Sequence, residues 1–472
     1  MPYFDPDVLA RDAGGEWNQV PSVAVRGFCQ DTRCLREGDL FVAIRAERDG
    51  HDFLRAAADA GATAALVEHF LDDCDLPQLR VPETGDAFLN IAQEHRLRFP
   101  GKVLGVTGSC GKTSTKDVLS LLLGGERCHA TEGNLNNHLG VPLTLLRLDS
   151  ARHDVAVVEA GINAPGEMER LARTISPDIV VVTMVGPSHL EGLGTVANVA
   201  AEKARLFEEA GRPVTVIFPE DCLRFDSFER ATREGLRTLV LKHGRTDEEP
   251  EEGTLLFDTS TETNGSGETA SLWLRRRGHP ALSLPLPTVS EGMASNCALA
   301  VAAAMELGST VEELSGRLPL FQPSALRGKR LRGRGTLYYL DCYNANPASM
   351  LDSAKYFRRL TGNVPKLFVL GGMEELGEDS RRFHREVGTA LLPRGEDRLL
   401  LVGEKAAWIG EGALEAGSAE EAVEFAPDME SARDAVAAFH GAVLLKGSRA
   451  NALETLVPAW AREEENSDEA RC

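Results

Sequence analysis

The sequence predicts a three-domain α/β protein built around a central nucleotide-binding domain. Its 472 residues exceed one ordinary core, and roughly 150 residues per domain suggests about three domains. Short apolar runs alternate with helical stretches, a pattern typical of parallel sheets covered by helices. A strand, a glycine-rich turn and a helix also follow residue 101, an order that suits phosphate binding. We therefore expect a small N-terminal α/β domain at 1–100, a central P-loop parallel-sheet ATPase domain at 101–322 and a C-terminal Rossmann-like α/β domain at 323–472.

The first hundred residues carry the pattern of a small α/β domain. Residues 39–44 form a strand-like run, residues 53–60 are alanine-rich and helical in character, and residues 63–67 form another apolar run. The turn-prone pair Pro100-Gly101 then marks a junction, so we place the domain boundary there.

The central domain begins with a phosphate loop between a strand and a helix. Residues 103–106 are apolar, lead into the loop at 107–113, and are followed by a helical stretch at 114–123. Further apolar runs at 155–158 and 179–183 predict two more buried strands of the same parallel sheet.

The second half of the central domain is less regular. Residues 224–287 are polar and rich in turn-forming residues, so we expect surface loops between antiparallel edge strands. A helix over 294–307 should close the domain.

The last part of the chain repeats the strand and helix alternation. Strands are expected at 336–341, 366–370, 398–402 and 442–446, which predicts a third α/β unit. The tail at 463–472 is highly charged, and we expect it to be frayed.

Composition excludes several classes of partner. With 72 acidic and 51 basic side chains the net charge is -21, which disfavours nucleic acid and anionic membranes, although a local basic cluster can still bind anionic substrates. No apolar run approaches the roughly 20 residues that cross a bilayer, and residues 1–12 do not form a secretory signal. We therefore expect a cytoplasmic protein without membrane insertion.

We expect the nine cysteines to be reduced thiols. They are scattered, odd in number and without a C-x-x-C pair, and a chain of this length does not need disulfides. Cys110 and Cys342 lie inside motifs, yet neither has the histidine and aspartate setting of a nucleophile.

The segment Thr107-Gly-Ser-Cys-Gly-Lys-Thr113 has the residues that a phosphate loop needs. Gly108 and Gly111 permit a tight backbone, Lys112 would neutralise the terminal phosphates, and Thr113 would offer a hydroxyl to Mg²⁺. The alternative is a glycine-rich turn with an incidental lysine. In addition, Val106 occupies the position at which the usual P-loop pattern has its first glycine. The strand and helix on either side favour ATP or GTP binding. The expected nucleotide contacts in the loop are Thr107, Gly108, Ser109, Cys110, Gly111, Lys112 and Thr113.

Further motifs follow the phosphate loop in a recognisable order. They are Glu132-Gly-Asn-Leu-Asn-Asn-His-Leu-Gly-Val-Pro-Leu-Thr144, Glu159-Ala-Gly161, His189-Leu-Glu191, Ala201-Glu-Lys203, Asp341-Cys-Tyr-Asn-Ala-Asn-Pro347, Gly371-Gly-Met-Glu-Glu-Leu-Gly377 and Lys446-Gly-Ser-Arg449. Asp31-Thr-Arg33, Gly38-Asp-Leu-Phe41 and Asp49-Gly-His-Asp-Phe53 precede the loop. Together these segments span nearly the whole chain and resemble the Mur ligases of peptidoglycan synthesis.

The resemblance implies an ATP-dependent amide ligase. In such a reaction the γ-phosphate of ATP is transferred to the terminal carboxylate of UDP-N-acetylmuramoyl-tripeptide, and the amine of D-alanyl-D-alanine then displaces phosphate. An acyl phosphate is needed because a carboxylate repels nucleophiles, so catalysis consists mainly of positioning and charge neutralisation. The motifs of the third domain are those that favour the dipeptide as the amine. The resemblance also implies a monomer with small-molecule substrates.

The resemblance assigns four catalytic residues, Lys112, Glu159, His189 and Lys203, and one further metal ligand, Thr113. Lys112 would hold the β- and γ-phosphates, Thr113 and Glu159 would bind one Mg²⁺, and His189 would bind a second Mg²⁺. Lys203 matches a lysine that is carbamylated in the family, a modification that the sequence itself does not show. From the residues alone, a structural salt bridge is the less favoured alternative for Glu159, whereas a loop histidine at 189 and an exposed lysine at 203 are the ordinary expectations.

The remaining site residues divide between ATP and the other substrates. The resemblance places Asn296 at the adenine, Asp341 at the ribose and Arg330 at the phosphates, with Arg327 as a competing arginine. Further expected nucleotide contacts are Asn137 and Asn344. The expected substrate contacts are Asp31, Thr32 and Arg33 for the uridine nucleotide, Asn136 and Asn346 for the substrate, and Lys446 and Arg449 for the carboxylate of the dipeptide. Turns and surface charge are the alternatives for these residues, including Tyr343 beside Asn344.

Two positions depart from the family pattern, and other functions stay open. Gly292-Met293 stands where members of the family typically carry His-Asn, and Gly372 stands where they carry an acidic residue. The alternatives are a Mur-type ligase that adds a single amino acid, a P-loop kinase or hydrolase, and a nucleotide-binding protein without ligase activity. Phosphate release that requires both the peptide and the amine would separate the ligases from the other two.

Overall fold

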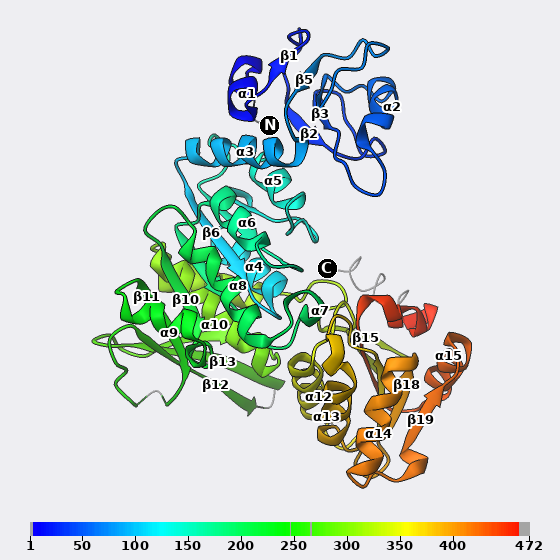
Figure 1. Cartoon of the computed structure of the whole chain (residues 1–472). Helices are drawn as coiled ribbons and strands as arrows, with labels where there is room; N and C mark the ends of the chain where they lie inside the picture. Colours follow the sequence, from blue (N-terminus) through cyan, green and yellow to red (C-terminus); the bar gives the residue numbers. More distant parts are fainter. Residues whose placement is uncertain (1–2, 246, 265–266, 462–472) are drawn as a thin grey trace.

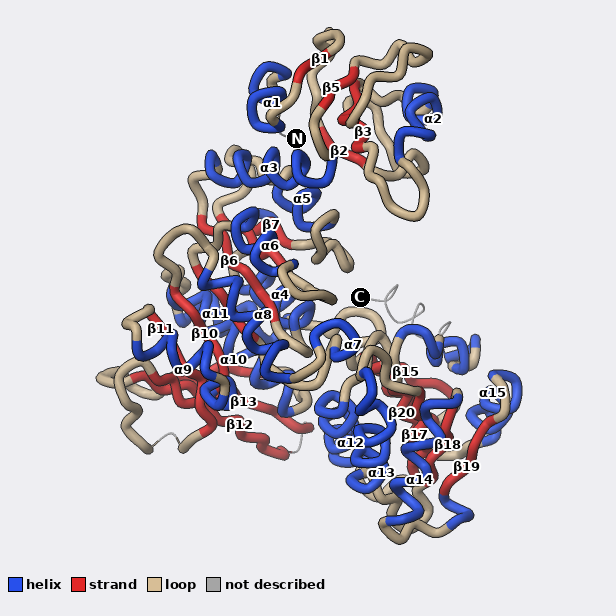
Figure 2. The backbone as a smooth tube through the Cα atoms, viewed as in Figure 1, coloured by secondary structure: helices blue, strands red, loops and turns tan. Residues whose placement is uncertain are grey.

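Three sheets follow one another along the chain in the computed structural model, which describes residues 3–245, 247–264 and 267–461 (Figure 1). Helices flank the strands of each sheet (Figure 2). We refer to the three parts centred on these sheets as the N-terminal, central and C-terminal domains. The predicted three-part α/β architecture is confirmed. The predicted tail at 463–472 lies outside the described residues.

The N-terminal domain is built on a five-stranded sheet in the order β1-β5-β4-β3-β2. The strands from β2 to β5 are parallel, and only β1 runs antiparallel to its neighbour β5. The strands are β1 (Glu16–Trp17), β2 (Gly27–Cys29), β3 (Asp39–Val42), β4 (Ala64–Val67) and β5 (Gln78–Arg80), and the helices are α1 (Pro6–Ala13), α2 (Leu54–Asp59) and α3 (Thr84–Arg98).

The central domain contains a nine-stranded sheet in the order β14-β13-β12-β11-β10-β9-β6-β8-β7. Its parallel strands are β6 (Lys102–Thr107), β7 (Cys128–Ala130), β8 (Val155–Glu159), β9 (Ile179–Val182), β10 (Thr215–Pro219), β11 (Arg237–His243) and β12 (Thr254–Asn264). Its helices are α4 (Lys112–Leu122), α5 (Gly140–Leu145), α6 (Glu167–Ile175), α7 (Leu190–Leu193), α8 (Val196–Glu208), α9 (Asp226–Arg233), α10 (Glu291–Glu306) and α11 (Val311–Arg317).

Antiparallel strands extend the edge of the central sheet. β13 (Gly267–Arg276) pairs with β12 and with β14 (Leu282–Leu286), so the predicted antiparallel edge strands are confirmed. The expected loops account for only part of residues 224–287, because α9 and β11, which were not predicted, also lie there. Consecutive polar residues such as Thr259 and Ser260 lie in this strand pair, and a polar run of this kind resembles loop sequence.

The C-terminal domain contains a six-stranded sheet in the order β15-β16-β20-β17-β18-β19. All neighbouring strands are parallel except β15 and β16. The strands are β15 (Lys329–Gly333), β16 (Thr336–Asp341), β17 (Lys366–Gly371), β18 (Arg398–Val402), β19 (Val423–Ala426) and β20 (Ala442–Lys446), and the helices are α12 (Pro347–Thr361), α13 (Ser380–Ala390), α14 (Ala407–Glu415) and α15 (Met429–Ala438).

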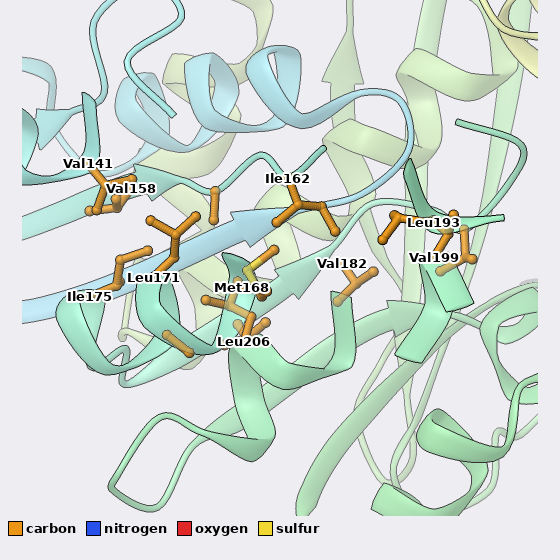
Figure 3. Close-up of a cluster of buried hydrophobic side chains, with 14 of the residues drawn as sticks. Val141, Val158, Ile162, Met168, Leu171, Ile175, Val182, Leu193, Val199 and Leu206 are labelled. Atoms are coloured by element: carbon orange, nitrogen blue, oxygen red, sulfur yellow. The ribbon is translucent and has the colours of Figure 1, made fainter. Parts of the chain in front are cut away.

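Alternation along the central strands supplies two apolar layers. On β8, Ala156 and Val158 belong to one buried cluster, and Val155 and Val157 belong to the cluster on the other face. A strand buried on both faces is typical of a parallel sheet covered by helices. Figure 3 shows part of the first layer, with labelled side chains Val141, Val158, Ile162, Met168, Leu171, Ile175, Val182, Leu193, Val199 and Leu206.

Helix α3 joins the first two domains. Its Arg96 is 1% exposed and donates hydrogen bonds to the carbonyls of Ile175 (3.1 Å) and Ser176 (3.0 Å) and to Asp178 (2.8 Å). Because a buried guanidinium must be paired, these contacts fix the end of α3 on the central domain. Among the described residues, no helix is both long and apolar enough to cross a membrane.

Candidate functional site

A cavity of about 630 Å³ lies between the central and C-terminal domains. On the central side it opens at the carboxyl ends of β6, β8 and β9, where β6 lies between the other two strands. Val106 pairs with Glu159 and Thr107 with Val182, so these strand ends stand side by side. Open α/β sheets bind ligands at such a point, and the volume suits a ligand of nucleotide size.

The phosphate loop forms one wall of the cavity. A side chain at Gly108 would overlap Thr183, and a Cβ atom at Gly111 would lie 2.5 Å from Asn296. Both glycines also have positive φ angles of 151° and 83°, so other residues would be strained there. Lys112 Nζ donates to the Gly108 carbonyl at 2.9 Å, which holds the ammonium over its own loop.

Hydrogen bonds from two hydroxyl groups of the loop anchor it to neighbouring backbone. Thr107 is buried and donates to the Ala160 carbonyl at 2.9 Å. Ser109 Oγ donates to the Gly186 carbonyl at 2.9 Å and accepts from the Gly186 N–H at 3.0 Å. These hydroxyl groups hold the loop in shape, and Ser109, Cys110, Lys112 and Thr113 line the cavity.

Glu159 is a buried carboxylate with one unsatisfied oxygen. Its side chain is 2% exposed, and Asn136 Nδ2 donates to Oε1 at 2.8 Å. Oε2 has no hydrogen-bond partner among the described residues. Leaving a buried carboxylate oxygen unpaired is costly, so this atom is suited to a cation in the cavity.

Lys203 is buried on α8 rather than exposed. Its side chain is fully buried, and Nζ has no hydrogen-bond partner within the described part of the chain. Burial lowers the pKa of Lys203 well below its usual value, and the nearby positive charge of Lys112 lowers it further. Burial therefore disfavours the charged form of this amine.

His189 connects the cavity to the C-terminal domain. It lines the cavity, and its Nδ1 lies 2.5 Å from a carboxylate oxygen of Glu375. The contact with His189 lowers the pKa of Glu375. Leu190 also donates its backbone N–H to the Glu375 carbonyl at 2.8 Å. His189 and Glu375 both have positive φ angles, of 53° and 62°, so two strained residues meet at this contact.

The C-terminal domain supplies the opposite wall from the ends of its parallel strands. Asp341 on β16 is in register with Lys446 on β20, and the two side chains form an ion pair at 3.0 Å. Lys446 is 2% exposed and also donates to the Asn344 carbonyl at 2.8 Å. All three residues line the cavity.

Asparagines bring the two walls together. Asn346 caps α12 and its Nδ2 donates to the Ser109 carbonyl of the phosphate loop at 3.5 Å. Asn296 on α10 lines the cavity beside Gly111. Asn137 also lines it, although its side-chain oxygen accepts from the backbone N–H groups of Leu139 and Gly140. Asn137 therefore also shapes the start of α5.

Both candidate arginines line the cavity, in different settings. Arg330 donates to the Thr288 carbonyl at 2.6 Å and to the Tyr356 hydroxyl. The Arg327 guanidinium lies 3.9 Å from the centre of the Tyr343 ring, a cation–π arrangement. The hydrogen bonds of Arg330 therefore connect the two domains, whereas the Arg327 guanidinium lies against the Tyr343 ring.

Four expected substrate-binding residues lie away from this cavity. Arg449 is exposed and paired with Glu454, although Lys446 of the same motif is in the cavity wall. Asp31, Thr32 and Arg33 lie in the N-terminal domain after β2, where Arg33 pairs with Asp31 at 2.7 Å. That pairing lowers the pKa of Asp31 to about 2.

Sequence reasoning missed several residues of the cavity. Thr183, Asp352 and Tyr356 line it, and Glu375 reaches His189. Glu375 lies in the Gly371 to Gly377 motif, which offered a signal. Asp352 and Tyr356 lie in ordinary helical sequence and offered none.

The cysteines are not arranged as nucleophiles. No disulfide joins the described cysteines. Burial raises the pKa of Cys110, and it raises the pKa of Cys342 to about 12, so both thiols stay protonated.

The residues present fit a magnesium–nucleotide complex better than a metal held by protein alone. Within the described ranges, no three His, Cys, Asp or Glu side chains gather closely enough to hold a metal ion. Mg²⁺ commonly uses one or two carboxylates and completes its shell with phosphate oxygens and water. The unsatisfied oxygen of Glu159 beside a phosphate loop is such a setting.

Two family models match the chain. The Mur ligase middle domain matches residues 106–304, and the glutamate ligase domain of Mur ligases matches residues 327–449. These ranges contain the two walls of the cavity.

Individual relatives extend the match to nearly the whole chain. The UDP-N-acetylmuramoyl-tripeptide–D-alanyl-D-alanine ligase of Bacillus subtilis is 30% identical over 450 residues, covering 93% of this chain and 94% of the relative. The ligase of the same name from Escherichia coli is 34% identical over 393 residues, covering 82% and 83%.

Two solved structures have the same fold as this chain. A crystal structure of MurF from Acinetobacter baumannii has a TM-score of 0.84 at 27% identity and covers 97% of this chain and 98% of its own. MurF from Thermotoga maritima in complex with ADP has a TM-score of 0.78 at 26% identity, covering 94% and 99%. The protein therefore belongs to the Mur ligase family.

Proposed function

We infer that this chain is an ATP-dependent ligase of peptidoglycan precursor synthesis, which joins D-alanyl-D-alanine to UDP-N-acetylmuramoyl-tripeptide. The observation that carries the inference is the cavity between the two domains, where a phosphate loop faces a buried lysine of the other domain. The two relatives from Bacillus subtilis and Escherichia coli are named for this reaction. The same cavity geometry suits in-line transfer between a nucleotide and a second substrate.

ATP would lie with its triphosphate on the phosphate loop and its base toward α10. The N–H groups of the loop and the N-terminus of α4 supply positive potential, and Lys112 adds a full charge. We assign Asn296 to the adenine and Asp341 to the ribose. Because Arg330 is already engaged by Thr288, Arg327 is the better candidate for the phosphates.

Thr113, Glu159 and His189 would hold the Mg²⁺ ions. When bound, Mg²⁺ neutralises the charge that builds up on the phosphate oxygens during transfer. Lys203, which is buried and has no hydrogen-bond partner among the described residues, is suited to carbamylation, because only a neutral amine reacts with carbon dioxide. The modification would turn a buried group without a partner into an anion beside the positive charge of Lys112.

The reaction proceeds in two displacements. A carboxylate oxygen of the tripeptide attacks the γ-phosphorus, and ADP leaves. The amine of the dipeptide then attacks the acyl carbon, phosphate leaves, and the nitrogen loses a proton. Lys446 and the asparagines at 136, 344 and 346 would orient the acceptor and the incoming amine, since they line the cavity that both must enter.

Each domain would bind a different substrate. The N-terminal domain at 1–100 would hold the uridine nucleotide through Asp31, Thr32 and Arg33. The central domain at 101–322 would hold ATP, and the C-terminal domain at 323–472 would hold the dipeptide through Lys446 and Arg449. We propose that the enzyme acts as a monomer in the cytoplasm, where ATP is available.

The decisive experiment supplies ATP, Mg²⁺ and UDP-N-acetylmuramoyl-tripeptide with either D-alanyl-D-alanine or single amino acids. We expect phosphate release and a product heavier by the dipeptide minus water, identified by mass spectrometry. A product with a single amino acid and none with the dipeptide would replace our substrate assignment by another Mur-type ligase. Phosphate release without any amine would instead support a hydrolase.

A further inference from the structure

A row of polar side chains on α12 faces the start of α10 across the two domains. Asp352, Lys355, Tyr356 and Arg359 have the spacing i, i+3, i+4 and i+7, which places them on one face of the helix. Opposite them lie residues 288–292, which end the β14–α10 connection and form the first turn of α10. We call these two sets of residues the interdomain seam.

The seam recognises backbone groups of the connecting segment. The Tyr356 hydroxyl donates to the Thr288 carbonyl at 2.7 Å. Arg359 donates to the next carbonyl, that of Val289, at 2.7 Å. Backbone groups have fixed positions, so these contacts set the register of α12 against the segment.

Asp352 completes the seam at the N-terminus of α10. Its Oδ1 accepts a hydrogen bond from the Gly292 N–H at 3.1 Å, and it also interacts with the Ser290 side chain. The first N–H groups of a helix lack partners within it, and a carboxylate is favoured there. The ion pair of Lys355 with Glu291 is exposed and adds little.

Glycine at 292 is explained by this carboxylate. Gly292 lies in the first turn of an α-helix, where its backbone conformation does not require glycine and where glycine weakens the helix. A Cβ atom there would lie 2.7 Å from Asp352 Oδ2 and 3.2 Å from its Cγ. The space that a side chain would need is therefore occupied by Asp352.

Both helices of the seam also touch the phosphate loop. On α10, Asn296 lies four residues after Gly292 and contacts the position of Gly111. On α12, the N-cap residue Asn346 donates to the Ser109 carbonyl at 3.5 Å. Fixing α12 against α10 therefore fixes both walls of the cavity around the loop.

We propose that Asp352 is an interdomain positioning residue, whose carboxylate occupies the space left by Gly292 and holds the C-terminal wall of the cavity over the nucleotide. Gly292, which departs from the family pattern, and Asp352 together form this one contact. Substituting either residue removes the same contact, so their effects are not independent.

A double-mutant cycle tests this coupling. The variants are Gly292→Ala, Asp352→Ala and the combination of both, measured in the full-length protein. Each single substitution should lower kcat roughly tenfold, the size expected for a lost hydrogen bond to a charged group, and leave KM for the UDP-linked substrate unchanged. In the Asp352→Ala background, Gly292→Ala should cost nothing further.

Hydrogen–deuterium exchange supplies a readout that does not depend on turnover. Backbone amides at 290–296 should exchange faster in Asp352→Ala and in Gly292→Ala, with or without nucleotide. Asp352→Asn keeps an acceptor oxygen and should retain most of the protection, whereas Asp352→Ser removes the carboxylate and replaces Asp352→Ala in the cycle if the latter does not fold. This readout also separates failure of the seam from failure of the ligase assignment.

Matched controls test whether the effects are specific to the seam. Gly316 lies in α11 of the central domain, and a Cβ atom there would meet nothing within 4 Å. Asp434 is an exposed acid on α15 of the C-terminal domain. Gly316→Ala and Asp434→Ala should leave kcat and exchange at 290–296 unchanged. Additive effects of Gly292→Ala and Asp352→Ala, or unchanged exchange in Asp352→Ala, would overturn the proposal.

Discussion

The interdomain cavity and the turn at residues 31–33 are both expected to bind charged substrates, yet they differ in how their polar groups are satisfied. At the cavity, Glu159 has a buried oxygen without a hydrogen-bond partner in the described structure, and Lys203, buried on α8, has a nitrogen without one. In the turn, Arg33 is 87% exposed and already paired with Asp31. Buried groups without partners indicate that a charged ligand is needed, whereas an exposed self-paired turn is stable alone. The cavity can therefore be identified from physical chemistry, but the turn cannot.

The largest effect should come from Lys112. Lys112→Ala removes the one full positive charge that the phosphate loop contributes, and phosphate release should fall at least about 100-fold. Phosphate release with all three substrates present is the measurement. Lys242→Ala, which removes an exposed lysine of the same domain paired with Glu220, is the control and should have no effect. Retention of more than a tenth of the rate by Lys112→Ala would show that the loop does not act as proposed.

Lys203 should separate stability from activity. Lys203→Met removes a buried amine without a hydrogen-bond partner and should raise the free energy of unfolding by about 1–3 kcal/mol in bicarbonate-free buffer. The same substitution should lower turnover roughly 100-fold and abolish any stimulation by bicarbonate. Denaturant unfolding and turnover with and without bicarbonate are the two measurements. A variant that is less stable and fully active would contradict the assignment.

The pH dependence of stability gives a further check on Lys203. Its pKa in the folded protein is lowered from the usual 10.5, so between the two values the unfolded chain binds more protons than the folded one. The free energy of unfolding should therefore rise with pH in this window and level off above 10.5. Comparison of wild type with Lys203→Met isolates this contribution, since the slope difference must vanish if Lys203 keeps its ordinary pKa.

A smaller effect is expected at the N-terminal turn. Arg33→Ala should raise KM for UDP-N-acetylmuramoyl-tripeptide about tenfold and leave kcat unchanged, because the contact would be equally strong in the ground and transition states. Arg55→Ala is a matched control, since Arg55 is also exposed and paired with an aspartate of the same domain. If both variants have the same KM as wild type, the uridine nucleotide binds elsewhere.

The smallest effect is expected at Arg449. Its guanidinium is exposed and paired with Glu454, whereas Lys446 is buried in the cavity wall. Arg449→Ala should therefore change KM for the dipeptide by less than about fivefold, the range of an exposed ion pair. Lys446→Ala should have a larger effect on the same constant. The opposite order would place the dipeptide carboxylate outside the cavity seen here.

Local patterns explain which parts of the fold were predictable. The strand, loop and helix over 102–122 are encoded by consecutive residues, and the sequence predicts them to within two residues. Strands such as β1 and β7 have two and three residues, too few to show a period of two. The β12–β13 pair contains a run of consecutive polar residues, so its composition resembled that of loops.

The candidate site divides in the same way. The phosphate loop and Glu159 follow strands directly, so sequence position alone predicts that they meet. The burial of Lys203 depends on which face of α8 packs inward, and its neighbours in sequence include exposed Ala201. The contacts of Glu375 with His189 and of Asp352 with Gly292 join residues of different domains. Tertiary contacts of this kind leave no local pattern in a single sequence.

The position of the cavity between two separately built sheets has a consequence for how the protein unfolds. The contacts between the central and C-terminal domains include hydrogen bonds, ion pairs and the contact of His189 with Glu375. Polar interfaces of this kind couple domains weakly. A nucleotide that contacts both walls binds only while both domains are folded, so mass action stabilises them together. Melting should therefore change from two separable transitions toward a single cooperative one as the concentration of nucleotide increases.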